Sequence, residues 1–439
     1  MPPLHLLQRL SARDITVGII GLGYTGLPLA VVLSEAGFRV VGVDIDQKKI
    51  TAIGAGQSVV EDVTSDRLAP LIAAERIRVT DDYDALRAAD AVIICVPTPL
   101  RKSQDPDISA IIHATEGVAP RLKPGALVVL QSTTYPGTTN EVVLPRLQEV
   151  AGTVGEDFFL AFAPERIDPG NKTYTLKNTP KLVGGVTARC AELAAALFET
   201  IVDEVITVSD PATAEMIKLL ENTFRAVNIG LINETALICK RLGIDVWEVI
   251  AGAATKPFGF MPFYPGPGLG GHCIPVDPQY LSWKLRTLDY DAQFIHLATQ
   301  INAAMPEYVV GLIGDALNAT LKPINGSRVL ILGVAYKRDV GDMRESPALA
   351  IIRRLLDLGA DLHYHDPHVP TLTLEDGRTL TSLPDLSPET LESADAVVIV
   401  TDHSRYNWDG IVRHAPLIID TRNATHAVRS HARGQIVKL

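Results

Sequence analysis

A single cysteine in a turn rich in glycine and proline carries the strongest chemical signal of this sequence. The stretch reads Gly270-Gly271-His272-Cys273-Ile274-Pro275-Val276-Asp277-Pro278, so that a carboxylate stands four residues after the thiol. A thiolate adds readily to an aldehyde and leaves readily from a thioester, so such a cysteine can carry an aldehyde on to a carboxylate. Taken alone, an isolated cysteine is more often a small buried hydrophobic residue.

His272 stands next to the cysteine and is the nearest candidate base for it. Adjacent positions in a sequence do not by themselves place two side chains together, because side-chain directions depend on the local backbone. We therefore expect His272 to have a structural role rather than a catalytic one.

A glycine-rich turn supplies the second signal. The run Gly21-Leu22-Gly23-Tyr24-Thr25-Gly26 follows an apolar stretch at 15–20 and precedes a helical pattern at 27–36, and Asp44 ends the next apolar stretch at 39–43. The glycines allow a tight turn close to phosphate, while the acid can accept hydrogen bonds from ribose hydroxyls and would repel the 2′-phosphate of NADP. We predict an NAD site here, the alternative being a sheet in which the glycines serve packing alone.

Two further strand ends carry polar residues where an α/β sheet binds its ligands. They are Val96-Pro97-Thr98-Pro99 and the run from Gln131 to Gly137, which contains Ser132 and Thr133. A Pro-Thr-Pro run alone is usually only a turn. Their position in the sheet makes Thr98, Ser132 and Thr133 candidate cofactor contacts.

Polar residues also follow another strand and occupy one helix face. Glu165 and Arg166 end the stretch at 160–163, and Lys218 and Asn222 stand one helical turn apart. A helical lysine is normally solvated, and the residues around Lys218 do not settle whether that face is exposed.

The elements that must position these residues form alternating strand and helix patterns. Apolar stretches at 15–20, 39–43, 91–96, 126–130, 160–163 and 181–184 predict one sheet, and helical patterns cover 210–242 and 294–321. A stretch at 329–332, a helix at 348–358, a strand ending at His365-Asp366, and stretches at 396–400 and 417–419 predict a second sheet. The predicted fold is α/β, with two Rossmann-like doubly wound domains joined by a helical middle domain. The expected boundaries are 1–207, 208–321 and 322–439. The second α/β unit keeps only Gly333 of the three glycines, so its turn should not admit a pyrophosphate in the dinucleotide manner.

Composition restricts the partners. The length of 439 residues suggests about three domains, and 47% hydrophobic residues are ample for their cores. The formal net charge of −11 argues against nucleic-acid or anionic-membrane partners. Its four cysteines show no metal-ligand spacing, so we expect no metal and a reducing compartment. Without a secretory leader or an apolar run of about 18 residues, we expect a cytoplasmic protein.

Together, these motifs resemble one enzyme family along nearly the whole chain. The motifs are Gly21, Gly23 and Gly26, Ser132-Thr133, Pro164-Glu165, Lys218 with Asn222, Gly270 to Cys273 with Asp277, and Lys337 to Glu345. In this order they resemble the UDP-glucose/GDP-mannose dehydrogenase family of nucleotide-sugar 6-dehydrogenases. The resemblance implies an NAD-dependent, four-electron oxidation of a sugar C6 alcohol through an aldehyde and a Cys273 thioester to a uronate.

The resemblance also implies roles for the remaining residues. Lys218 and Asn222 would stabilise oxyanions at C6, Asp277 with Thr133 would orient a water for proton removal, and Glu165 would assist thioester hydrolysis. The cofactor contacts would be Gly21, Gly23, Tyr24, Thr25, Gly26, Asp44, Thr98, Ser132, Thr133 and Arg344. The substrate contacts would be Glu165, Arg166, Lys218, Asn222, Tyr264, Gly268, Gly270, Lys337 and Arg422. The helical domain offers a homodimer surface, from which Lys256 is a candidate to reach a neighbouring subunit's site.

Two residues of the cysteine turn depart from the UDP-glucose enzymes. Ile274 and Val276 stand where those enzymes commonly have phenylalanine and lysine, which makes the turn more similar to the branch that oxidises UDP-N-acetylhexosamines. The leading hypothesis is oxidation of UDP-N-acetylglucosamine to its uronate for surface polysaccharide. The alternatives are UDP-N-acetylmannosamine or UDP-glucose as substrate, a simple two-electron dehydrogenase, and a catalytically silent nucleotide-sugar sensor.

Overall fold

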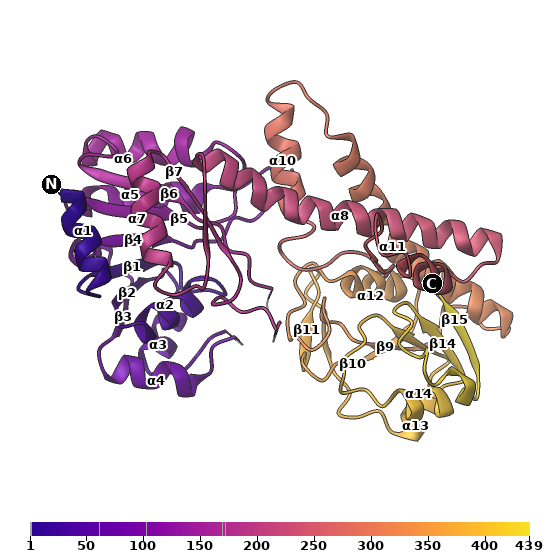
Figure 1. Cartoon of the computed structure of the whole chain (residues 1–439). Helices are drawn as coiled ribbons and strands as arrows, with labels where there is room; N and C mark the ends of the chain where they lie inside the picture. Colours follow the sequence, from indigo (N-terminus) through magenta and orange to yellow (C-terminus); the bar gives the residue numbers. More distant parts are fainter. Residues whose placement is uncertain (1, 61, 102, 169, 172) are drawn as a thin grey trace. The chain divides into compact units, whose positions relative to one another are not determined.

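The computed structural model describes residues 2–60, 62–101, 103–168, 170–171 and 173–439, with side chains from residue 5 onward (Figure 1). The chain forms two compact units. The first contains residues up to 221 together with 279–290, and the second contains 222–278 and 291–439. Two helices therefore belong partly to each unit: α8 (Pro211–Leu242) and α10 (Asp277–Arg286).

The first unit is built on a sheet of eight strands within the described residues. The strands are β1 (Thr16–Ile20), β2 (Arg39–Val43), β3 (Ile77–Thr80), β4 (Ala91–Ile94), β5 (Ala126–Leu130), β6 (Phe158–Phe162), β7 (Lys181–Gly185) and β8 (Val205–Val208). Its helices are α1 (Pro2–Ser11), α2 (Gly26–Glu35), α3 (Gln47–Gly54), α4 (Ser65–Ala73), α5 (Ser109–Val118), α6 (Leu144–Ala151) and α7 (Ala188–Phe198), with short turns η1 (Tyr83–Ala88), η2 (Ala119–Arg121) and η3 (Thr139–Val143). The spatial order β3-β2-β1-β4-β5-β6 is that of a dinucleotide-binding sheet, which β7 and β8 extend.

One strand pairing differs from the parallel pattern. β7 runs antiparallel to β6, with Ala161 opposite Gly185, whereas the other pairings in this sheet are parallel. The chain between β6 and β7 consists of turns in its described part, and a parallel crossover normally needs a helix to return the chain to the same edge. The helix α7 then provides such a crossover from β7 to β8.

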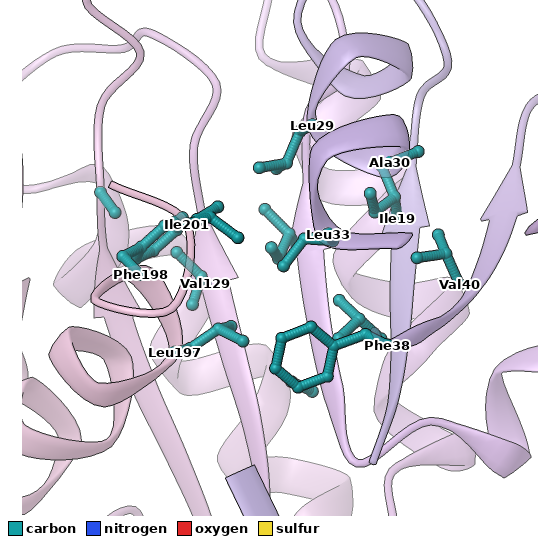
Figure 2. Packing of buried hydrophobic residues seen from close by; sticks show 14 of the residues in the cluster. Ile19, Leu29, Ala30, Leu33, Phe38, Val40, Val129, Leu197, Phe198 and Ile201 are labelled. Carbon is teal, nitrogen blue, oxygen red and sulfur yellow. The ribbon is translucent and has the colours of Figure 1, made fainter. Parts of the chain in front are cut away.

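Apolar side chains fill the space between this sheet and its helices. Leu29 and Leu33 of α2 and Phe198 of α7 lie over the strands that carry Ile19 and Val129 (Figure 2). All five side chains are fully buried, and each contributes about 1.5–3 kcal/mol relative to exposure. The sheet is apolar on both faces because helices cover both, which explains the continuous apolar strands of the sequence.

The second unit combines helices with a parallel sheet of order β10-β9-β13-β14-β15. Its strands are β9 (Arg328–Leu332), β10 (Asp361–His365), β13 (Ala396–Ile399), β14 (Leu417–Asp420) and β15 (Gln435–Lys438), and β11 (Thr371–Thr373) pairs with β12 (Thr379–Thr381). Its helices, besides its part of α8, are α9 (Val246–Ala254), α11 (Gln293–Ala319), α12 (Pro347–Asp357), α13 (Pro388–Ser393) and α14 (Trp408–His414), with η4 (Arg429–His431). Residues of α11 and α12 share one hydrophobic core with this sheet.

The sequence predicted part of these elements to within a few residues, but it did not specify the strands β3, β8, β11, β12 and β15. The strands β2 and β5 have the expected bounds, and the helical pattern at 210–242 is α8. The start of α12 illustrates why such boundaries are predictable: Ser346 caps the helix by accepting from the Ala348 amide, and Pro347 occupies its first position. No helix in the described part of the chain has the length and apolar character needed to cross a membrane.

Candidate active site

The cysteine turn leads directly into a helix. The carbonyl oxygen of Cys273 accepts hydrogen bonds from the amides of Val276 and Asp277, at 3.1 and 2.8 Å, and α10 begins at Asp277. A bond between residues four apart places their side chains on one face, so the spacing of cysteine and carboxylate is that of a helical turn. The N-terminal end of a helix also favours negative charge, as on a thiolate.

His272 contacts the cysteine. The Sγ atom of Cys273 lies 3.1 Å from Nδ1 of His272. Adjacency in the sequence left this contact open, and the turn brings the two side chains together; the contact does not test the structural role expected for His272. An imidazole at this distance can accept the thiol proton or stabilise the thiolate as imidazolium.

Asn222 and Asp277 are joined by a hydrogen bond. The Nδ2 atom of Asn222 donates to Oδ2 of Asp277 at 2.5 Å, and Asp277 is buried. An amide carries two N–H donors, so one donor of Asn222 is not used in this bond. The bond ties α8 to the first residue of α10 within the second unit.

Lys218 stands one turn before Asn222 on α8 and is buried, with 8% of its surface exposed. Buried lysines are rare unless they have a task or a partner. The question that the sequence left open is thus decided: Lys218 is not a solvated surface residue.

The glycines before Cys273 are required by close packing. A Cβ atom on Gly270 would lie 2.6 Å from Cβ of Tyr336, and Gly271 has φ +83° and donates its amide to the carbonyl of Arg344 at 3.0 Å. Gly268, with φ +131°, also occupies a conformation that other residues rarely adopt. The loop that contains Tyr336 and Arg344 therefore packs directly against the cysteine turn.

A cavity of about 290 Å³ lies beneath this turn within the second unit. Ile274 and Pro275 line one side, and Pro306 of α11 and Pro347 of α12 line others. The wall is mostly apolar. Ile274 thus contributes to the lining of this cavity.

Each glycine of the turn after β1 has its own physical reason. Gly21 has φ +93°, and a Cβ there would lie 2.6 Å from the carbonyl oxygen of Cys95. A Cβ on Gly26 would lie 1.8 Å from the carbonyl oxygen of Gly21, whereas one on Gly23 would meet no atom of the chain within 4 Å. Gly21 and Gly26 are thus needed by the fold, and Gly23 leaves open space beside the backbone. These residues fit a bound dinucleotide pyrophosphate.

Asp44 closes the same site at the end of β2. Its carboxylate accepts hydrogen bonds from the amides of Leu22 and Asp46, at 2.8 and 3.0 Å, and Lys49 of α3 lies 3.8 Å away. Asp44 therefore holds the glycine turn as well as facing the expected ribose position. Sequence reasoning missed Lys49; its signal was a lysine one helical turn after the acidic pair Asp44 and Asp46.

The loops after β4 and β5 contact each other. The hydroxyl of Thr98 donates to the carbonyl of Thr133 at 2.8 Å, and the hydroxyl of Ser132 donates to the carbonyl of Val96 at 2.8 Å. The hydroxyl of Tyr280, on α10, donates to the carbonyl of Thr98. Tyr24 and Thr25 lie at the start of α2, where Tyr24 is exposed and Thr25 precedes the first helical residue.

Glu215 of α8 was missed by the sequence analysis. Its buried carboxylate accepts the amide of Gly137 at 2.6 Å and the amide and hydroxyl of Thr139 at 2.9 and 2.6 Å. Burial raises the pKa of Glu215 to about 7, and the three donors oppose that rise. This carboxylate anchors the loop that follows Ser132 and Thr133 to α8. An acid within an apolar helical stretch was the available signal.

The carboxylate of Glu165 accepts hydrogen bonds from four donors. Its Oε1 accepts the amides of Arg166 and Ile167 at 2.8 and 3.0 Å, and its Oε2 accepts Nε2 of Gln131 at 3.1 Å and Nζ of Lys181 at 3.2 Å. Burial by itself would raise the pKa of Glu165, but the charge of Lys181 and the amides outweigh burial and lower it. The carboxylate is thus held ionised and is a weak base.

Lys181 belongs to this network and was also missed by the sequence analysis. It is the first residue of β7, is 5% exposed, and also donates to Oε1 of Gln131 at 3.2 Å. A lysine opening an otherwise apolar strand was the only signal in the sequence. Arg166 is engaged nearby: it donates to the carbonyl of Pro180 and pairs with Glu221 of α8 at 2.6 Å.

Basic residues of the C-terminal sheet gather at its carboxyl edge. Arg422 donates Nε to the carbonyl of Val400 at 2.8 Å, and a Cβ on Gly266 would lie 2.5 Å from its Nη1. Burial, together with the charge of Arg338, which sequence reasoning missed, lowers the pKa of Arg422 to about 10. Two guanidinium groups in one region favour an anion. Lys337 is half-buried beside Arg338.

The remaining predicted residues are placed as follows. Arg344 forms an ion pair with Asp342 in its own loop, at 2.5 Å. Tyr264 is exposed and stacks on Trp247 at 6.1 Å between ring centroids. Lys256 lies over the ring of Phe258, 4.9 Å from its centroid. The cofactor residues lie on the first unit apart from Arg344, and Cys273, Asn222 and Asp277 lie on the second.

Comparisons with known proteins cover most of the chain. Models of the UDP-glucose/GDP-mannose dehydrogenase family match in chain order: the NAD binding domain at 15–202, the central domain at 212–304 and the UDP binding domain at 330–427. The chain is 38% identical to the UDP-N-acetyl-D-mannosamine dehydrogenase of Pyrococcus horikoshii, over 93% of this chain and 95% of the relative. It is 34% identical to the UDP-N-acetyl-D-glucosamine 6-dehydrogenase of Pseudomonas aeruginosa, over 90% and 92%. The solved structure of a UDP-D-ManNAc dehydrogenase from Pyrococcus horikoshii superimposes with a TM-score of 0.84 at 36% identity, covering 93% of this chain and 96% of that one.

Proposed function

Because this chain belongs to the UDP-glucose/GDP-mannose dehydrogenase family, and is an NAD-dependent oxidoreductase that acts on the CH–OH group of a UDP-sugar, we propose that its substrate is a UDP-N-acetylhexosamine. The first candidate is UDP-N-acetylglucosamine, oxidised at C6 to UDP-N-acetylglucosaminuronate. Relatives named for UDP-N-acetylhexosamines and the residues Ile274 and Val276 support the class.

The observation that carries the mechanism is the geometry of the cysteine turn. Cys273, in contact with His272, lies one helical turn before Asp277, which is bonded to Asn222. Bound NAD would supply the hydride acceptor for the two oxidations at C6. Cys273 adds to the aldehyde after the first oxidation, and the resulting thiohemiacetal becomes a thioester in the second. Water then cleaves the thioester, returning the thiol and releasing the carboxylate.

His272 enters this proposal in place of its expected structural role. Its Nδ1 atom, 3.1 Å from Sγ, takes the thiol proton as Cys273 attacks and returns a proton when the thioester is cleaved. The remaining donor of Asn222, and Lys218 on the same helix, would stabilise the oxyanion at C6. Thr133 and Asp277 would hold the water through which the alcohol proton leaves.

Glu165 is assigned a different part in hydrolysis from a simple base. Four donors and a lowered pKa make it a poor proton acceptor, so we propose that it orients the hydrolytic water as a fixed anion. Lys181 keeps it in that state.

The test is the yield of NADH per mole of limiting sugar nucleotide, with NAD in excess, on UDP-N-acetylglucosamine, UDP-N-acetylmannosamine and UDP-glucose side by side. Two equivalents on UDP-N-acetylglucosamine, at the highest kcat/KM of the three, are expected. One equivalent would remove Cys273 from the reaction and indicate a two-electron dehydrogenase. No turnover together with tight NAD binding would indicate a nucleotide-sugar sensor. Undiminished uronate formation by Cys273→Ser would also contradict the covalent mechanism.

UDP-N-acetylmannosamine is the second candidate, because the relative at 38% identity is named for that substrate. The two sugars differ in configuration at C2 alone, so the same assay separates them. UDP-glucose, which lacks the acetamido group, is the third.

We further propose a homodimer formed through α8. Phe224, Leu231, Ile238 and Leu242 are exposed apolar residues at spacings of seven, seven and four, so they share one helix face. A second copy of the chain would cover this face. Light scattering should give twice the chain mass, and Leu231→Glu with Ile238→Glu should give a monomer; an unchanged mass in that variant would contradict the interface.

The division into functional regions completes the proposal. We assign residues 1–207 to NAD binding, 208–321 to catalysis and dimerisation, and 322–439 to the UDP end of the substrate, where Arg422 and Lys337 would meet phosphate or base. A cytoplasmic location is supported by four free cysteines. Expression with a reporter fused to the chain would locate it.

A further inference from the structure

Three potential metal ligands meet at the carboxyl edge of the C-terminal sheet. Asp339, His368 and His403 each present one ligand atom, and these atoms lie within 4.8 Å of one another. They come from the loops that follow β9, β10 and β13, which are neighbours in the sheet. The carboxyl ends of adjacent parallel strands are where α/β sheets assemble sites, so three distant segments converge here by topology.

The ligand atoms of these three residues lie slightly farther apart than the ligands of a bound zinc ion. The Oδ1 atom of Asp339 lies 3.9 Å from Nδ1 of His403 and 3.9 Å from Nε2 of His368. Tetrahedral zinc with bonds of 2.0–2.1 Å holds neighbouring ligand atoms about 3.3 Å apart. The three ligand atoms lie within 4.8 Å of one another, so the site would have to contract on binding, and Asp339 lies on an exposed part of its loop.

A buried carboxylate is hydrogen-bonded to the ring of His403. The Nε2 atom of this fully buried ring lies 3.1 Å from Oδ2 of Asp366. The same carboxylate also accepts the amides of Val334, Ala335, His368 and Val369. Because a carboxylate accepts, Nε2 of His403 is the donor and Nδ1 is an acceptor, which in this structure accepts the amide of Asp339 at 2.9 Å. Histidines that bind metals commonly donate their other nitrogen to a carboxylate in this way.

The ring of His368 has a buried Nε2 atom. Nε2 of His368 has no hydrogen-bond partner among the described residues, and the ring lies 4.9 Å from that of His403, centroid to centroid. Buried polar atoms are nearly always paired, so an unpaired one calls for a reason. A missing ligand at this nitrogen is such a reason.

We propose that Asp339, His368 and His403 bind one divalent transition-metal ion of the zinc class, with a fourth coordination position left open. Two imidazoles and one carboxylate are a ligand set that suits zinc. Two other contacts belong to the site: the amide of Asp339 donates to Nδ1 of His403 at 2.9 Å, and Oδ1 of Asp339 accepts the amide of Ser404 at 2.8 Å. The metal replaces the first contact, so the peptide at Asp339 turns away when the ion binds.

The bound ion would join the loop after β9 to two others. That loop carries Lys337 and Arg344 and packs against the cysteine turn through Tyr336. Because metal that binds only the folded form stabilises it, the second unit should unfold at a higher temperature with zinc present. This proposal does not depend on which UDP-sugar is oxidised.

The first experiment measures binding to the full chain. After treatment with a chelator and its removal, the chain is titrated with zinc by calorimetry and with cobalt by visible absorption. We expect one zinc per chain and the strong visible bands of four-coordinate cobalt. Asp339→Asn and His368→Gln should each weaken zinc binding at least tenfold. His363→Gln, which removes a histidine paired with Asp361 on β10, is the matched control and should bind as the unaltered chain does.

A second measurement does not rely on variants that fold. X-ray absorption at the zinc edge of the unaltered chain should count two imidazoles at the ion. Fewer than two imidazoles, no zinc taken up, or unchanged affinity in the variant with both Asp339→Asn and His368→Gln would each overturn the proposal. The surface pairs His414 with Glu392 and His431 with Asp409 can bind zinc weakly, and the imidazole count separates them from the proposed site.

Discussion

Lys181→Met offers the sharpest test of the network around Glu165. The change removes the ammonium 3.2 Å from Oε2 of Glu165 while keeping an apolar stem of similar length. Both side chains are largely buried, at 6% and 17% exposed, so water cannot replace the lost charge well. The variant leaves a carboxylate with hydrogen-bond donors but without an opposite charge.

The size of the effect follows from this geometry. Two unit charges at that separation interact by about 5 kcal/mol at an effective dielectric constant near 20. Removing one partner of a buried pair costs about 3–5 kcal/mol in measured cases. For a unit of this size each kcal/mol lowers the unfolding midpoint by about 2–4 °C, so the first unit should lose on the order of 10 °C at neutral pH.

The loss should depend on pH in a defined direction. The folded-state pKa of Glu165 is lowered, so its contribution to stability is present above its ordinary value of 4.5 and is lost as the pH falls through the folded pKa. In Lys181→Met the pKa of Glu165 rises. The difference between the unaltered chain and the variant is therefore largest near neutral pH and shrinks in acid.

The assay is scanning calorimetry of four proteins: the unaltered chain, Lys181→Met, Lys181→Met with Glu165→Gln, and Lys177→Met. Lys177 is an exposed lysine of the segment before β7 and serves as the matched control. We expect the double variant to be more stable than Lys181→Met, because a neutral amide needs no charge partner. A midpoint for Lys181→Met equal to that of the control, or a double variant less stable than the single one, would refute the reasoning.

Three further predictions concern the cofactor turn, a buried acid and the cysteine. Gly23→Ala should keep the unfolding midpoint of the unaltered chain but weaken NAD binding at least tenfold in calorimetric titration. Gly26→Ala should lower the unfolding midpoint and also weaken NAD binding, because its Cβ would lie 1.8 Å from a carbonyl oxygen. Equal losses of stability in the two variants would contradict this reasoning. For Asp90, burial would raise the pKa, but donors including Arg9 and Lys123 outweigh burial and lower it. Asp90→Asn should therefore lower the free energy of unfolding by about 1–3 kcal/mol at neutral pH. In denaturant titrations this difference should disappear as the pH falls below 3.8 and through the lowered pKa of the folded state. His272→Gln should slow alkylation of Cys273 by iodoacetamide at pH 7 roughly tenfold, and an unchanged rate would return His272 to a structural role.

Local sequence patterns determined the elements and the cofactor turn. The run from Gly21 to Gly26 between an apolar strand and an amphipathic helix predicts its own conformation, because turn, strand and helix preferences act over a few residues. The same holds for the spacing of Cys273 and Asp277, which one helical turn converts into a shared face. Patterns of this kind need no knowledge of distant parts of the chain.

Only the tertiary structure decided which polar residues work together. Lys181 reads as an ordinary charge at the start of a strand, yet β7 turns antiparallel to β6 and brings it to Glu165, sixteen residues away. The three loops that carry Asp339, His368 and His403 meet because β9, β10 and β13 are adjacent in the sheet. The contact between His272 and Cys273 depends on the backbone of the turn. Contacts between distant segments, and the directions of side chains within a turn, follow from packing of the whole fold, whereas strand, helix and phosphate-turn signals follow from neighbours in the chain.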